Sequence, residues 1–112
     1  MTEAHRVDGE FVFVTSPRTD LPSLATVAEP EGTSHVLRRE DADGLGFTYD
    51  FVAAWLTATA QTSLDELGIT ARLSRALAEA GIACNVIAGH HHDHLLVPVD
   101  RCQDALAAVR DA

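Results

Sequence analysis

Four of the six histidines in the chain lie within five consecutive positions, in the segment AGHHHDH from Ala88 to His94. Imidazole is a common metal ligand and changes its charge near neutral pH. If the segment is extended, His90, His92 and His94 share one face, because side chains alternate along a strand. Residues two apart then lie ~6.6 Å from one another, a spacing that can suit two ligands of one Zn²⁺.

These histidines alone do not make a complete metal site. A structural zinc site takes four ligands, and Cys84 is the only obvious soft ligand to add. Gly89 indicates a turn at this point, which would break the alternation of a strand. We therefore expect weak, adventitious metal binding and no cofactor. Metal binding through His90, His92 and His94 is kept as the alternative function.

A catalytic site has little support in the sequence. Ser63 or Ser74 with a histidine and an aspartate would supply the residue types of a hydrolase triad. However, the chain contains neither a G-x-S-x-G nucleophile elbow nor a glycine-rich phosphate loop. Cys84 lies in an apolar segment, where burial would raise the thiol pKa and reduce reactivity. The sequence therefore favours a non-catalytic protein.

The charge of the chain excludes two classes of partner. The formal net charge is −9, and the eight basic residues are all arginines. The only adjacent pair, Arg38-Arg39, is followed at once by Glu40-Asp41. Nucleic acids and acidic membrane surfaces both require clustered basic side chains, so neither is an expected partner. The chain also lacks an apolar stretch of ~18 residues and the layout of a signal peptide, so we expect a cytoplasmic protein.

The second half of the chain shows a clear alternation of strands and helices around the histidine run. Apolar residues at three- and four-residue steps from Ile69 predict an amphipathic helix, and Gly81 supplies a left-handed end. Ser63 and Glu66 match a capping box before it. The predicted elements are a buried strand at Asp50–Ala60, this helix, strands at Ile82–Ala88 and His94–Val99, and a last helix capped by Asp100 with Gln103.

The first half predicts strands with little helix. A strand at Glu10–Ser16 is stopped by Pro17, and Leu24–Glu29, the turn Pro30-Glu31-Gly32 and Thr33–Arg39 form a hairpin. Asp41–Gly46 can form at most a short helical turn because of its two glycines. Together the elements predict an α+β, ferredoxin-like fold in which helices cover one face of an antiparallel sheet.

The segments SLDELGIT, from Ser63 to Thr70, and AGIACNV, from Ala80 to Val86, resemble the ACT domain. This βαββαβ module binds amino acids and regulates metabolic enzymes. The pattern is similar to the ACT repeats of aspartate kinase and, with His92-Asp93-His94, to short bacterial proteins built from tandem ACT-like units. The resemblance implies two degenerate halves, residues 1–49 and 50–112, in one compact structure. The second half ends before a fourth strand and the first half lacks room for a first helix, so each is expected to complete the other's sheet.

The resemblance also implies a ligand site for an amino acid or a similar small molecule in a regulatory or sensor protein. Gly68 would let backbone amides approach a carboxylate, since free N–H groups at a helix start favour anions. Asn85 is equally compatible with a satisfied structural amide and with a place beside the ligand or a dimer partner. The expected ligand-binding residues are Ser63, Leu64, Asp65, Leu67, Gly68, Ile69, Thr70, Asn85, Val86, Ile87, His92 and His94.

We also expect a two-fold homodimer joined by sheet edges or helix faces, with the N-terminal strand packed into the shared sheet. Sheet edges either pair or need protection, and Glu10–Ser16 and Ile82–Ala88 carry few charges to protect them. A bare interaction module without a working ligand site remains a third possibility.

Overall fold

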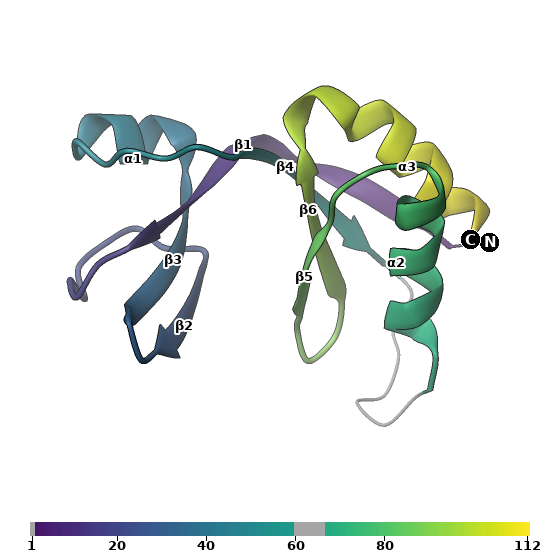
Figure 1. Ribbon diagram of the computed structural model, residues 1–112, viewed down its shortest axis with the longest axis horizontal. Coiled ribbons are helices and arrows are strands. Elements are labelled where there is room, and N and C mark those ends of the chain that lie inside the picture. Colours follow the sequence, from purple (N-terminus) through teal and green to yellow (C-terminus); the bar gives the residue numbers. More distant parts are fainter. Residues whose placement is uncertain (1, 60–66) are drawn as a thin grey trace. The chain divides into compact units, whose positions relative to one another are not determined.

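The computed structural model describes residues 2–59 and 67–112, which form two compact units (Figure 1). The N-terminal unit is Gly9–Ala53. The C-terminal unit contains the chain up to Asp8 together with the described part of Ala54–Ala112. Strands β1 (Ala4–Thr15) and β4 (Val52–Ala58) each contribute residues to both units. The expected division into halves 1–49 and 50–112 stays a prediction.

The N-terminal unit is built on the predicted hairpin. Strands β2 (Ala25–Glu29) and β3 (Gly32–Arg38) pair antiparallel with Val27 opposite Ser34, and β3 pairs with β1 with Val36 opposite Phe13. Gly32 follows the turn with φ 133°, a conformation that favours glycine. Helix α1 (Arg39–Gly44) is the short helical turn that the sequence allows. The core of this unit contains Val12, Val14, Leu37 and Ala42, with Leu21, Phe47, Tyr49 and Val52 packed against it.

The C-terminal unit places two helices on one face of its strands. Helices α2 (Ile69–Glu79) and α3 (Cys102–Asp111) pack on β4 and on β6 (Asp93–Pro98), and β5 (Asn85–Ala88) pairs antiparallel with β6. The shared core contains Ala54, Leu56, Ala58, Leu73, Leu77, Leu95, Val97, Leu106 and Val109. The strand order here is β1-β4-β6-β5. The fourth strand that the second half lacked is therefore supplied by the start of β1. None of the helices in the described ranges is long and apolar enough to cross a membrane.

The end of helix α2 explains why β5 is shorter than the predicted strand. The N–H of Gly81, with φ 72°, donates to Ala78 O and the N–H of Ile82 donates to Leu77 O. This pair of bonds is the Schellman ending, which satisfies the last carbonyls of a helix. Ile82 is buried in the core, so it belongs to the helix ending, and pairing of β5 begins only at Asn85.

Two other sequence predictions are wrong. Glu10–Ser16 was expected at a sheet edge, but β1 lies between β3 and β4, and the edges are β2 and β5. Asp100 was expected to cap the last helix, but it lies in a 3-10 turn (Val99–Arg101), and α3 begins at Cys102 without a side-chain cap. The predicted capping box at Ser63 and Glu66 lies outside the described residues.

Candidate functional site

The histidine run forms the turn of the β5–β6 hairpin. The N–H of Gly89 donates to His92 O at 2.9 Å, and Ala88 and Asp93 are the last paired residues. His90 and His91 have ring centroids 4.5 Å apart in a stacked arrangement, and His91 is exposed. The turn breaks the strand alternation that a shared metal-binding face required. Across residues 2–59 and 67–112, no three His, Cys, Asp or Glu side chains gather as a metal-binding set, so the alternative of a site at His90, His92 and His94 has no structural support.

His94 is the most constrained histidine of the run. Trp55 Nε1 donates a hydrogen bond to His94 Nδ1 at 3.1 Å, and Thr57 Oγ1 lies 3.1 Å from the same nitrogen. The Trp55 and His94 rings meet edge to face, with centroids 5.4 Å apart. An indole N–H can only donate, so Nδ1 must be unprotonated and the neutral ring carries its proton on Nε2.

The surroundings of His94 favour the neutral imidazole. Burial lowers its pKa from the ordinary value, and repulsion from His92 lowers it further, while Asp93 raises it. The net pKa shift is downward. The hydrogen-bond geometry and the pKa therefore agree that His94 is neutral at physiological pH.

Gly89 and His92 complete the packing of this turn. A Cβ atom at Gly89 would lie 3.1 Å from His92 O and 3.2 Å from His94 Nε2, so the close approach favours glycine. His92 Nδ1 is buried and has no hydrogen-bond partner within the described chain. Its ring lies edge to face with His94 at a centroid distance of 6.4 Å. The turn therefore has little space for an additional atom or charge.

The first turn of α2 offers unprotected backbone donors. Gly68 is its N-cap with φ 85° and has no side chain to accept a hydrogen bond, and the first turn has no acidic residue. The first turns of α1 and α3, by contrast, both contain acidic residues. Leu67, Gly68 and Thr70 are exposed, whereas Ile69 packs on the core. Of the other residues expected in this loop, Ser63, Leu64 and Asp65 lie outside the described residues.

The remaining expected residues lie on two faces of the strands in the C-terminal unit. Val86 packs on the core beneath the helices. Ile87 pairs with His94, and Asn85 is exposed. Because side chains alternate, Asn85 and Ile87 project to the face opposite Val86. A ligand that touches both groups would therefore have to reach around the edge strand β5.

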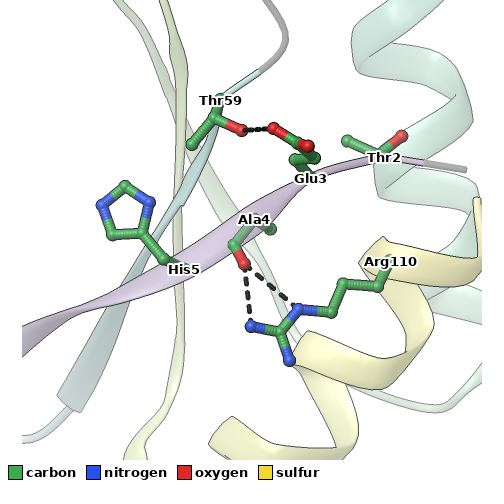
Figure 2. A pocket seen from close by; sticks show the side chains of 6 residues that line it. All are labelled: Thr2, Glu3, Ala4, His5, Thr59 and Arg110. Atoms are coloured by element: carbon green, nitrogen blue, oxygen red, sulfur yellow. Dashed lines mark hydrogen bonds between the residues drawn. The ribbon is translucent and has the colours of Figure 1, made fainter.

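A hollow of about 670 Å³ lies beside the start of β1, where sequence reasoning placed no site (Figure 2). Arg110 donates from Nε and Nη2 to Ala4 O at 3.1 and 2.9 Å, and Thr59 Oγ1 donates to Glu3 Oε2 at 3.2 Å. Thr2, Glu3, Ala4, His5, Thr59 and Arg110 line the hollow. They come from both ends of the chain and from the residue that follows β4, so no local motif could indicate it.

Known proteins and protein families match almost the whole chain. Models of the ACT domain family match residues 2–54 and 51–111. A Vibrio cholerae protein of unknown function, described as a possible transport protein, is 37% identical, with 95% of this chain and 85% of that chain covered and a TM-score of 0.90. The ligand-free regulatory subunit of Thermus thermophilus aspartate kinase is 9% identical, with 97% and 95% covered and a TM-score of 0.68. An aspartokinase structure with alpha and beta subunits is 12% identical, with 96% and 95% covered and a TM-score of 0.69. No curated protein matches the chain.

Proposed function

Since the chain belongs to the ACT domain family, we propose that it is a cytoplasmic, non-catalytic regulatory or sensor protein that binds an amino acid or a similar small ligand. The observation that carries the proposal is the first turn of α2. Its Gly68 cap is exposed and positive in φ, and the first turn itself contains no acidic residue. Such a helix start attracts a carboxylate through its free N–H groups and its dipole.

The proposed ligand contacts extend from this turn to the neighbouring hairpin. The carboxylate would lie on the amides that follow Gly68, close to the exposed Thr70. An acidic residue, either Asp65 or Glu66 before the helix in the sequence or Asp93 in the hairpin, would receive the amino group. Val86 packs on the same core as Ile69 and would border the ligand's side chain. His92, His94, Asn85 and Ile87 would define the hairpin end of the site, which the ligand would reach around the edge strand β5.

A thermal-shift screen with the individual amino acids tests the proposal, because a ligand of the native state raises its melting temperature. Calorimetry would then compare Gly68→Ala with Gly81→Ala, its matched control at the other end of α2. Both glycines have positive φ, and a Cβ added at either would meet no heavy atom within 4 Å, so both variants should lose about 1 kcal/mol of stability. Only Gly68→Ala should weaken binding, by more than about fivefold, because its methyl group obstructs the amides.

Two results would count against this assignment. If no amino acid raises the melting temperature, the proposed ligand class is wrong. If a ligand binds Gly68→Ala as well as it binds the unaltered protein, the ligand lies elsewhere, and the hollow beside Arg110 becomes the next candidate.

We further propose that the protein is a two-fold homodimer joined through a sheet edge. Strand β5 is an edge and carries no charged residue, and β2, the other edge, carries only Glu29. Val27 at the middle of β2 is 57% exposed. An edge with few charges offers unpaired backbone groups with which a second chain can pair. Light scattering should give twice the 12.0 kDa chain mass, and a monomer at high micromolar concentration would contradict the proposal.

A further inference from the structure

We infer that neutral His94 fastens the turn end of the β5–β6 hairpin to strand β4 by accepting a hydrogen bond from Trp55, and that protonation of His94 breaks this bond, which makes the contact pH-responsive. The inference rests on the atoms that meet at one nitrogen. Trp55 Nε1 and Thr57 Oγ1, both from β4, each lie 3.1 Å from His94 Nδ1. A proton on Nδ1 would face the indole N–H, so two donors would oppose each other and the Trp55 bond would be lost.

The ring has no easy way to escape this conflict. Rotation about its bond to the chain would have to occur beside Gly89, which approaches so closely that an added Cβ would lie 3.2 Å from Nε2. The edge of Trp55 packs at 5.4 Å and His92 at 6.4 Å, centroid to centroid. The Thr57 hydroxyl can reverse its role and accept from a protonated Nδ1, but the indole N–H of Trp55 can only donate, so loss of the Trp55 bond is the response to a proton on Nδ1.

The charges around His94 act on its protonation in opposite directions. His92 in the turn opposes a positive charge on the ring, and Asp93 on the same strand favours it. The facing residues of the other elements, Trp55 and Thr57 on β4 and Ile87 on β5, do not titrate near neutral pH. Burial is the largest influence and also opposes the charge. The contact should therefore persist at neutral pH and be lost at a pH below the ordinary histidine pKa.

A regulatory consequence follows, and it rests on the proposed function. The hairpin contains His92, His94 and the strand that would border the ligand, so loss of its bond to Trp55 would weaken ligand binding in acid. The pH response itself belongs to the protein alone and can be measured without any ligand. Failure of the ligand site would therefore leave this inference standing, and failure of this inference would leave the ligand site standing.

Trp55 is the only tryptophan in the chain, so its fluorescence reports directly on this contact. A titration of the full chain from about pH 7.5 to pH 5 should show one change in Trp55 emission, with a midpoint below 6.5. The indole N–H loses its acceptor on His94, so the intensity or the wavelength of the emission should change. Far-ultraviolet circular dichroism should stay constant over the same range, which separates a local change from unfolding.

Three variants make the experiment decisive. His94→Asn retains a hydrogen-bond acceptor for Trp55 without a titrating group, so the emission change should disappear. His91→Asn, at an exposed turn position, should titrate like the unaltered protein. Gly89→Ala should displace the His94 ring by contact with Nε2, so its emission at neutral pH should already differ from that of the unaltered protein. A transition that persists in His94→Asn, or no transition in the unaltered protein, would overturn the inference.

Nitrogen chemical shifts of the histidine rings give a second measurement in case His94→Asn does not fold. In the unaltered protein, His94 should be the Nε2–H tautomer at neutral pH and become doubly protonated with a midpoint below 6.5. The indole N–H resonance of Trp55 should move with the same midpoint. A proton on Nδ1 at neutral pH, or a midpoint at or above 6.5, would contradict the inference.

Discussion

Two histidines, one in each unit, are held by hydrogen-bond partners of different kinds. His35 on β3 is 3% exposed, with Nε2 2.9 Å from the backbone oxygen of Ser16 and Nδ1 2.7 Å from Ser23 Oγ. The carbonyl accepts from Nε2, and the serine hydroxyl can either donate to Nδ1 or accept from it. His94 Nδ1 faces an indole donor, Trp55 Nε1, as well as the Thr57 hydroxyl. The same side chain is therefore a fixed structural bridge in one unit and a proton-sensitive contact in the other.

The difference shows that the hydrogen-bond partners of a histidine, more than its burial, decide whether its contacts are sensitive to protonation. His35 is the more buried of the two, and it connects the long segment between β1 and β2 to β3 through two partners. A hydroxyl can reverse its role and an indole cannot. A run of histidines in a sequence suggests a functional site, whereas an isolated histidine such as His35 gives no such signal.

The largest expected effect is the loss of stability when His35, the structural histidine, is replaced. His35→Ala would remove the bridge, leave the Ser16 carbonyl unpartnered by imidazole and create a cavity, so the free energy of unfolding should fall by about 2 to 4 kcal/mol. Urea denaturation followed by circular dichroism measures it. His91→Ala, at the exposed hairpin turn, is the matched control and should change stability by less than about 0.5 kcal/mol. Equal effects in the two variants would show that the bridge contributes nothing.

The elements of the C-terminal unit were predictable because their signals are local. The spacing of Leu73 and Leu77 predicts the buried face of α2, and both are fully buried. Gly81 predicts its end, and the end is confirmed in detail by the Schellman bonds. The continuous apolar run around Trp55 predicts a buried central strand, and residues 53–58 of β4 are all buried. Local periodicity therefore sufficed where each element packs one continuous face.

The sequence predictions were wrong where the structure depends on residues far apart in the chain or on an unrecognised turn. Nothing within Glu10–Ser16 shows that β1 lies between two strands, because its partners β3 and β4 are set by the topology of the whole sheet. The placement of Asp100 failed because a 3-10 turn separates the end of β6 from α3. Local capping patterns are common enough to occur without a cap.

The sequence predicted which types of residue form the candidate site, but it did not predict which of them are in contact. Gly89 correctly predicted a turn in the histidine run, and this turn is what separates His90 and His91 from His94. Trp55 and Thr57 were recognised only as members of an apolar strand. Their approach to His94 spans 39 and 37 residues of sequence, a separation at which no spacing rule applies. The alternation of Asn85, Val86 and Ile87 between two faces likewise depends on which face the helices cover.

The smallest expected effect is a pH dependence of stability on the proton-sensitive side of the comparison. The pKa of His94 is lowered in the folded protein, so below about pH 6.5 the unfolded chain binds more protons than the native state. The contribution of His94 to stability is therefore complete above that pH and is lost as the pH falls toward the folded-state pKa. Urea denaturation at several pH values should show that the unaltered protein loses stability in acid relative to His94→Asn. The difference should change by less than about 1.4 kcal/mol per pH unit, the limit for one proton. His91→Asn should keep the full slope, and a difference from His94→Asn of the opposite sign would mean that the folded state favours the charged ring.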